Sequence, residues 1–469
     1  MLYMRRLFFL RFAAVAVAMA VLLSSLGVCG INFENEMYIR VGLYYGSSTA
    51  GRYTMNCPDG FTIVSFDEET YKITEIKNIY AVSGTATAEN SVINIEFSDG
   101  EVYSGEKVYI APISPDGSRA LISVPSGKKF CGMMRFTAKD TRLTVVNILK
   151  LEDYIKGVLP NEVPSSWEEE CLKAAAVAAR SFVLSSIGGK HRSDGFDVCS
   201  TIHCQVYNGA GSEAETSNAA VDATRSQILE YKGRAIQALY HSSSGGATES
   251  AAGAWGSSEK DFPYLTVVET PFERYEEYPW GTWTAQVSRK ELYEYINGKS
   301  AYAGKLKDTI ADIEYTPGPS GYVRKVVVSD PYGNKITVNT SSSVYSLFSK
   351  YVMSANFVIR FGGSCKVDGE GTMTENLAKF ASLVSVLAVK GIAVSGDKIE
   401  TSKGGKVLLI PENEDDDSIT FIGKGYGHGV GLSQYGAREL AKEGYTYSEI
   451  LETYYPGTNL TDIDSVYND

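Results

Sequence analysis

The chain has 469 residues, of which 44% are hydrophobic and 21% are charged, and this balance excludes an intrinsically disordered protein. Its 44 Lys and Arg against 56 Asp and Glu give a formal net charge of −12, which argues against nucleic acid as a general partner because nucleic acids bind basic faces. Seven Cys do not make a disulfide scaffold, and the length allows about two or three domains.

Residues 1–30 are predicted to be a targeting segment. Arg5, Arg6 and Arg11 precede an uncharged apolar run over residues 12–28, a pattern that fits either a signal peptide or a signal anchor. Positive charges ahead of such a run place the following residues outside the cytoplasm. We therefore expect an extracytoplasmic body that is anchored in the membrane by this segment, or secreted if the segment is cleaved.

Strands are predicted from about residue 36 to residue 150. Short runs rich in β-branched and aromatic residues alternate there with Gly, Asn, Asp and Ser; examples are IRVGLYY, FTIVSF, SVINIEF, KVYIAPI, FCGMMRF and LTVVNIL. Helical signals then take over. LEDYIKGVL predicts a short helix closed by Pro160, and ECLKAAAVAARSFVLSSI predicts an Ala-rich helix with Ser166 as its N-cap.

The remaining chain mixes both types, so we predict an α+β fold. Strands are expected at YVRKVVVSD and NKITVNT and a helix near KELYEYI. Ser433 is predicted to cap the helix QYGARELAK, and Thr446 with Glu449 forms a capping box for YSEILETYY. An acidic run over residues 412–417 reads as a solvated loop.

Glu162 is the first candidate for chemistry. It lies between Pro160 and Pro164 in a predicted loop between two helices, so its backbone is held on both sides. Apolar neighbours such as Val158 and Trp167 would raise a carboxyl pKa toward the range useful for a general acid. The alternative is a solvent-facing loop glutamate without a function.

The segment HRSDGFDVCSTIHC is the second candidate. It gathers two of the four His and two of the seven Cys within 14 residues, namely His191, Cys199, His203 and Cys204. Thiolate and imidazole are preferred zinc ligands, and four of them make a closed, structural site. A Cys199–Cys204 disulfide is the main alternative outside the cytoplasm, and the third is that the residues do neither.

Two further segments suit contacts to a ligand. His241 is followed by three Ser and by Gly245 and Gly246; without the nucleophile elbow of a serine hydrolase, this favours a Ser/Gly loop that hydrogen-bonds a ligand. In GKGYGHGVGLSQYGA, alternate glycines allow a close backbone approach, and Tyr426 and His428 would point the same way from an extended strand. The segment suits one wall of a glycan cleft, or else a strand packed tightly in the core.

Together these segments resemble the SpoIID/LytB family of bacterial cell-wall proteins. The resemblance rests on VVNILKLEDYIKGVLPNEVPSSW, LKAAAVAARSFVL, DVCSTIHCQVYNG, YHSSSGGATES and GKGYGHGVGLSQYGARELAKEGYTYSEILETYYPGT, which occur in the family's order. It implies a membrane segment over residues 1–30, a β-rich region over 31–126 and a SpoIID/LytB-like domain over 127–460. Residues 365–418 look like a family-variable insertion.

The resemblance also implies an activity. SpoIID-like members look like lytic transglycosylases that cleave peptidoglycan between N-acetylmuramic acid and N-acetylglucosamine, preferring strands stripped of stem peptides, during engulfment of the forespore and beside a partner amidase. The family's catalytic glutamate matches Glu162. Some clostridial relatives bind zinc through a His/Cys cluster, which carries over to Cys199, His203 and Cys204, with His191 as the least constrained ligand.

A lytic transglycosylase works with one carboxylate, whereas hydrolytic glycosidases usually need two. We expect Glu162 to protonate the glycosidic oxygen and then to accept a proton from the C6 hydroxyl of the muramyl sugar, which closes a 1,6-anhydro ring. No organic cofactor is expected. The predicted lining of the glycan cleft comprises Gln205, Ser243, Gly245, Gly246, Tyr426, His428 and Gln434.

Two rival functions use the same residues. LytB-like members are described as amidase enhancers, which would bind cell-wall glycan without an acid. A zinc amidase would use the His/Cys cluster with His241, but zinc with two thiolates and two imidazoles has no open position for catalysis.

Overall fold

The computed structural model describes residues 37–68, 70, 72–115, 119–278, 280–361, 392–395, 398–401 and 417–467. They form two compact units: unit 1 holds the described residues up to Ala238 and those from Asn459 onward, and unit 2 runs from Leu239 to Thr458. Both contain helices and sheets, so the predicted α+β class is confirmed. The predicted targeting segment lies outside the described residues, within which no helix is long and apolar enough to cross a membrane.

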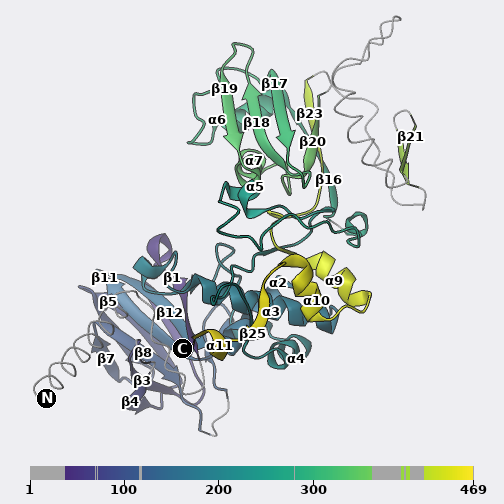
Figure 1. The fold of residues 1–469 in the computed structure, drawn as a ribbon. Coiled ribbons are helices and arrows are strands. Elements are labelled where there is room, and N and C mark those ends of the chain that lie inside the picture. Colours follow the sequence, from purple (N-terminus) through teal and green to yellow (C-terminus); the bar gives the residue numbers. More distant parts are fainter. Residues whose placement is uncertain are drawn as a thin grey trace, which may run out of the picture. The chain divides into compact units, whose positions relative to one another are not determined.

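Two β-sheets pack against each other in unit 1 (Figure 1). The larger has the order β13-β1-β12-β11-β8-β3-β4, with β1 (Tyr38–Tyr44), β3 (Phe61–Phe66), β4 (Ile73–Ile79), β8 (Lys107–Pro112), β11 (Met133–Lys139), β12 (Arg142–Lys150) and β13 (Val198–Cys199). The smaller has the order β10-β9-β2-β5-β6-β7, with β2 (Arg52–Asn56), β5 (Ser83–Glu89), β6 (Val92–Phe97), β7 (Val102–Gly105), β9 (Ile122–Ser123) and β10 (Lys129–Phe130). Residues of both sheets form one hydrophobic core.

The boundary predicted between residues 126 and 127 falls inside unit 1, between β9 and β10 of one sheet. The predicted run FCGMMRF is divided between β10 and β11, because the intervening Gly132 has φ +72° and a side chain there would meet the Ile148 carbonyl.

The rest of unit 1 contains α2 (Leu151–Glu162), α3 (Glu169–Ser186), α4 (Glu215–Ala223) and β14 (Gln227–Glu230). β14 pairs with β25 (Asn459–Asp462), which is followed by the short α11 (Asp464–Tyr467). Two expectations were wrong. Pro160 lies inside α2 instead of ending it, because its fixed φ suits a helix and Val163 still donates to the Leu159 carbonyl. The N-cap of α3 is Glu168, two residues after the predicted Ser166.

Unit 2 contains two three-stranded sheets around a second core (Figure 1). One has the order β16-β23-β20, with β16 (Thr282–Ser288), β20 (Phe357–Phe361) and β23 (Ser418–Lys424); the other has the order β17-β18-β19, with β17 (Asp312–Pro317), β18 (Val323–Ser329) and β19 (Lys335–Asn339). The helices are α5 (Ala251–Trp255), α6 (Arg289–Asn297), α7 (Ser341–Phe348), α9 (Gln434–Lys442) and α10 (Tyr447–Tyr454), and β15 (Tyr240–His241) pairs with β24 (Leu432–Ser433). β21 (Ile392–Ser395) and β22 (Lys398–Thr401) pair with each other in a two-stranded hairpin.

The predicted insertion begins and ends at neighbouring strands. β20 precedes residues 362–417 and β23 follows them, and the two strands pair directly. Most of the expected insertion over 365–418, with the acidic run up to residue 416, lies outside the described residues. A stretch whose two ends already meet in a sheet can lengthen without rearranging the core.

The C-terminal caps are confirmed. Ser433 Oγ accepts the backbone N–H of Gly436 at 3.2 Å at the start of α9. Thr446 Oγ1 accepts the N–H of Glu449 at 3.4 Å, and the Glu449 carboxylate accepts the N–H of Thr446 at 2.8 Å. Caps can be predicted well because they depend on residues only three positions apart.

Candidate functional site

Glu162 is the last residue of α2, at the point where the chain leaves the core of unit 1. The preceding Val158 and Leu159 and the following Val163 are buried, whereas the Glu162 side chain is only partly buried. Its Oε1 accepts the backbone N–H of Val206 at 2.9 Å. Glu162 therefore sits at a helix end instead of in the predicted loop, and it is held by the segment that follows Cys204.

A buried ion pair joins α2, which ends at Glu162, to α3. The Arg180 guanidinium is fully buried in α3 and donates to both carboxylate oxygens of Glu152 in α2, at 3.0 and 2.7 Å. It also donates to the Gln227 carbonyl, while Glu152 accepts the N–H of Ser226. The pair thereby fixes α2, α3 and the start of β14 together.

We expect Arg180→Met to destabilise the protein by roughly 3–5 kcal/mol, because the variant leaves the Glu152 carboxylate buried without its counter-charge. Urea unfolding monitored by circular dichroism measures this loss. The double variant Glu152→Leu/Arg180→Met removes both charges and should be more stable than the single variant. Equal losses in both would show that packing, and not the unpaired charge, is responsible.

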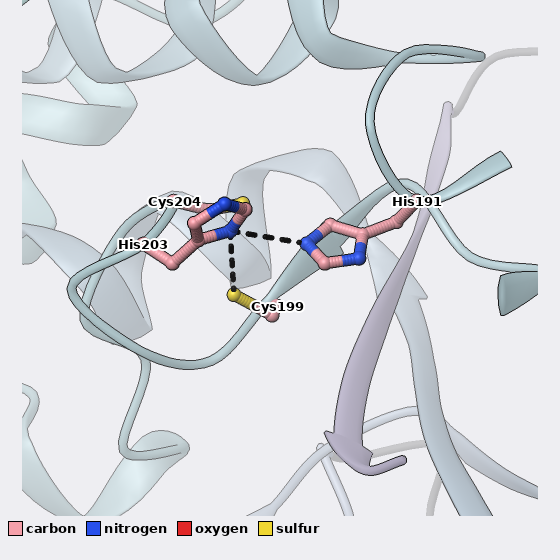
Figure 2. Close-up of side chains that lie close together, drawn as sticks. All are labelled: His191, Cys199, His203 and Cys204. Atoms are coloured by element: carbon pink, nitrogen blue, oxygen red, sulfur yellow. Dashed lines mark hydrogen bonds between the residues drawn. The ribbon is translucent and has the colours of Figure 1, made fainter. Parts of the chain in front are cut away.

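The His/Cys cluster is brought together as predicted, including His191 (Figure 2). His191 precedes a 3-10 turn, Cys199 ends β13, and His203 and Cys204 follow in the next loop. The four ligand atoms lie within 4.8 Å of one another, and Cys199 and Cys204 are both free thiols.

The three distances from His203 Nδ1 to the other ligand atoms fit a tetrahedral zinc ion. Zinc bound by nitrogen at about 2.05 Å and by sulfur at about 2.3 Å would set two nitrogens about 3.3 Å apart and a nitrogen and a sulfur about 3.6 Å apart. The His191 Nε2–His203 Nδ1 distance is 3.3 Å, and His203 Nδ1 lies 3.7 Å from Cys199 Sγ and 3.6 Å from Cys204 Sγ. His191 Nδ1 lies 2.9 Å from the Asp194 carboxylate, the kind of contact that orients an imidazole for a metal.

A network of charged side chains anchors the cluster to the larger sheet. Asp197 is buried two residues before Cys199 and accepts from Arg40 of β1 through both carboxylate oxygens, at 3.1 and 2.7 Å. Arg135 of β11 donates to the Gly195 carbonyl at 2.7 Å and to Glu68. These contacts tie the segment between His191 and Cys199 to the larger sheet.

Gln205, predicted to line the glycan cleft, is instead 1% exposed. Its Oε1 accepts from the Tyr154 hydroxyl at 3.1 Å, and its Nε2 donates to the Ala179 carbonyl at 3.3 Å. The side chain therefore links α2 and α3 inside unit 1. Its backbone neighbour Val206 is the group that touches Glu162, and sequence patterns carry no signal for such a main-chain contact.

The other predicted glycan contacts lie in unit 2, where a buried carboxylate organises the Ser/Gly loop. Glu273 accepts the hydroxyls of Ser243 at 2.6 Å and of Ser433 at 3.0 Å, the hydroxyl of Ser244, and the Ser244 N–H at 3.1 Å. Burial raises the pKa of Glu273, and these donors oppose that rise. Ser243 is thus buried and engaged, so the serines here shape the loop. Sequence reasoning missed Glu273, which lies about 30 residues from the motif.

The glycine-rich segment is not the expected extended strand. β23 ends at Lys424, and Gly425, Gly427, Gly429 and Gly431 all have φ between +74° and +105°. A side chain at Gly431 would meet the Leu239 carbonyl. The glycines therefore allow a close approach to neighbouring backbone, although not as the packed strand of the core alternative, while Tyr426 remains 44% exposed and His428 is partly buried. Gly245 and Gly246, both at positive φ, form the facing turn, and Gln434 is the first residue of α9.

His241 lies beneath this segment and is buried. Its Nδ1 lies 3.2 Å from the Val430 carbonyl and its ring centroid lies 5.6 Å from that of His428. A carbonyl only accepts, so Nδ1 carries the hydrogen, and the Nε2 lone pair has no hydrogen-bond partner. Burial, and secondarily His428, lower the pKa of His241 to about 3.

This pKa predicts a loss of stability in acid. Between the unfolded pKa of about 6.5 and the folded value of about 3, the unfolded chain binds the extra proton, so stability falls as the pH falls. When the pH is lowered from 7 to 4.5, the titration of His241 should reduce the free energy of unfolding by about 2 kcal/mol. Urea unfolding at both pH values measures it. His241→Leu cannot titrate and should show a correspondingly smaller difference; an equal difference would assign the acid sensitivity to other groups.

Comparisons with known proteins find a family match over the segment that holds these candidate residues. A family described as "SpoIID: Stage II sporulation protein" matches residues 139–231, which include Glu162 and the His/Cys cluster. The "Amidase enhancer" of Bacillus subtilis is 31% identical over 66% of this chain, and the match covers 40% of that protein's own length. "Stage II sporulation protein D" of the same organism is 27% identical over 69% of this chain and 78% of its own length.

A third relative, an uncharacterized protein of Brachyspira hyodysenteriae, is 27% identical over 92% of this chain and 95% of its own length. The similarity thus extends over both units and is not confined to the segment around Glu162. The family match over residues 139–231 and these relatives together support the assignment of the chain to the SpoIID/LytB family.

Proposed function

We propose that this protein is a peptidoglycan lytic transglycosylase that cleaves MurNAc–GlcNAc bonds in stem-peptide-free glycan and acts outside the cytoplasm in sporulation-related cell-wall remodelling. The observation that carries the proposal is the position of Glu162: a partly exposed carboxylate at a rigid helix end, with one oxygen held by a backbone donor. A general acid must be accessible to substrate and fixed in direction, and Glu162 meets both requirements.

Glu162 performs both proton transfers. As the acid, it donates its proton to the glycosidic oxygen while the bond between that oxygen and C1 of the muramyl sugar breaks. As the base, the resulting carboxylate takes the proton of the C6 hydroxyl while O6 bonds to C1. The products are a free 4-hydroxyl and a 1,6-anhydro ring, and Glu162 returns to its starting state without an activated water.

We also propose that His191, Cys199, His203 and Cys204 hold a structural zinc ion. The distances support a four-coordinate site, and four protein ligands leave no position for substrate. Bound zinc would supply rigidity to the loop. The chain's own contribution is the Val206 N–H, two residues beyond the last ligand, which keeps the Glu162 carboxylate oriented.

Product analysis tests the activity. The full chain is incubated with stem-peptide-free glycan strands, and the soluble products are identified by mass spectrometry. We expect peptide-free fragments that end in 1,6-anhydro-N-acetylmuramic acid. The mass of each is lower by one water molecule than that of the corresponding hydrolysis product. Reducing ends would instead identify a hydrolase. In a parallel incubation with intact peptidoglycan, release of free peptides that stops with a chelator would identify a zinc amidase.

The second candidate is a non-catalytic amidase enhancer, which the name of the 31% identical relative favours. An enhancer releases nothing from glycan alone but accelerates a cell-wall amidase on intact peptidoglycan. Incubation of the chain with stem-peptide-free glycan alone, and with intact peptidoglycan in the presence and absence of an amidase, separates the two functions. Stimulation without anhydro products would replace the transglycosylase proposal.

A further inference from the structure

Tyr45 lies directly beside the His/Cys cluster of unit 1. It follows the end of β1, the strand that pairs in parallel with β13, where Gly42 is the register partner of Cys199. The Tyr45 ring centroid lies 5.4 Å from that of His191, and the two rings meet edge to face. The strand pairing therefore brings an aromatic residue from an early part of the chain to two of the four proposed zinc ligands.

Packing holds the Tyr45 ring in place. The ring centroid of Phe196 lies 4.9 Å from that of Tyr45 and 4.6 Å from that of His191. Gly42 leaves the space for Phe196, because a Cβ at Gly42 would lie 2.5 Å from the Phe196 ring. Three aromatic rings thus pack on one another beside the cluster. A ring that packs on two neighbours in this way presents its hydroxyl in a fixed direction.

The Tyr45 hydroxyl forms a hydrogen bond with the sulfur of Cys199. Burial first, and then this hydrogen bond, raise the pKa of Tyr45 to about 12, so the hydroxyl keeps its proton at neutral pH. A cysteine that binds zinc does so as a thiolate, which has no proton to donate. Tyr45 is therefore the donor and Cys199 the acceptor when the metal is bound.

Thr201 supplies a second hydroxyl to the same sulfur. Its Oγ1 lies 3.3 Å from Cys199 Sγ and accepts the backbone N–H of His203 at 3.3 Å. A hydroxyl has one hydrogen and two lone pairs. Since the His203 N–H occupies a lone pair, the hydrogen is left for the sulfur. Cys199 is fully buried, so bulk water does not compete with the two hydroxyls.

Hydrogen bonds to a metal ligand affect how firmly the metal is held. They orient the ligand and tune the charge that it donates to the metal. Loss of one such outer contact typically lowers metal affinity by roughly 10- to 100-fold. The two hydroxyls at the Cys199 sulfur are contacts of this kind.

We propose that Tyr45 is a positioning residue for the zinc site: its hydroxyl, together with that of Thr201, donates hydrogen bonds to the Cys199 sulfur and so strengthens the hold on the metal. The inference rests on the proposed zinc ion. It adds two residues that contact a ligand without binding the metal themselves. It does not depend on Glu162 or on the transglycosylase activity.

The zinc affinity of the full chain tests the proposal. The protein is stripped of metal and titrated with zinc in competition with a chromophoric chelator. Tyr45→Phe keeps the ring and deletes only the hydroxyl, and we expect it to raise the Kd for zinc by roughly 10- to 100-fold. Thr201→Val removes the second hydroxyl and should raise the Kd in the same direction.

Tyr44→Phe is the matched control. Tyr44 is the preceding residue, is 40% exposed, and packs its ring against Tyr53. The same chemical change at this position should leave the Kd for zinc at the wild-type value. Thermal unfolding of each metal-loaded variant shows whether its fold is native.

Cobalt(II) bound in place of zinc shows whether the hydroxyl acts on the sulfur itself. A hydrogen bond withdraws charge from a thiolate. Its loss should therefore move the sulfur-to-cobalt charge-transfer band to longer wavelength in Tyr45→Phe and Thr201→Val, and not in Tyr44→Phe. A purely structural role of the Tyr45 ring would leave this band where it is.

Tyr45→Phe with a native fold and the wild-type Kd would overturn the proposal. A weaker Kd with an unmoved charge-transfer band would also overturn it, because Tyr45 would then act through packing alone. If Tyr45→Phe does not fold, Thr201→Val decides on the same two measurements. A wild-type chain that binds no zinc would refute both the zinc site and this inference, whereas the transglycosylase proposal is judged separately, by its products.

Discussion

Glu162→Gln should reduce the formation of 1,6-anhydro products from stem-peptide-free glycan by about 10²- to 10⁴-fold, the usual contribution of a positioned general acid. The amide keeps the shape of the carboxylate, and its oxygen can still accept the Val206 N–H. It has no proton to give to the glycosidic oxygen and cannot accept one from the C6 hydroxyl. Initial rates by liquid chromatography and mass spectrometry measure the loss.

Glu169→Gln provides the matched control for this variant. Glu169 begins α3, only seven residues further along the chain, and its exposed side chain pairs with Lys173. The same chemical change there should leave the rate and the unfolding temperature unaltered. Should Glu162→Gln retain the full rate with a native unfolding curve, another group must be the acid, and the enhancer function becomes the better account.

The second large effect is expected on protein stability when the proposed zinc ion is lost. We expect the purified chain to contain about one zinc ion per molecule, and Cys199→Ser or His203→Ala to abolish its retention. Since metal binding is coupled to folding, either change should cost on the order of 5 kcal/mol and lower the Tm by about 10 °C or more. Inductively coupled plasma mass spectrometry and thermal unfolding with and without a chelator measure both effects.

Activity should fall in the same variants, because the loop that presents Val206 to Glu162 is no longer fixed. Ile202→Ser is the control: Ile202 lies in the same loop, is 91% exposed and is not a ligand. It should keep zinc, Tm and activity. A native protein without zinc in which Cys199 and Cys204 resist thiol reagents until reduced would establish the disulfide alternative instead.

The elements that the sequence predicted correctly share one property: their signals are local. The caps at Ser433 and Thr446 depend on neighbours three residues away, and strands such as β12 and β18 depend on continuous β-branched runs. β5 was missed because its inward side chains are Gly84, Ala86 and Ala88, which carry little β signal but fit closely between the sheets.

The residues of the candidate site fall into the same two groups, those with a local sequence signal and those that depend on packing. The types of residue and their spacing were enough to name Glu162 as a candidate acid and the four residues of the His/Cys cluster as candidate ligands, because a metal site and an acid need particular functional groups whatever surrounds them. The buried positions of Gln205 and Ser243, the Glu273 carboxylate and the backbone donor at Val206 came only with the folded chain. Each depends on which distant segments pack together, and packing of that kind leaves no pattern between neighbouring residues.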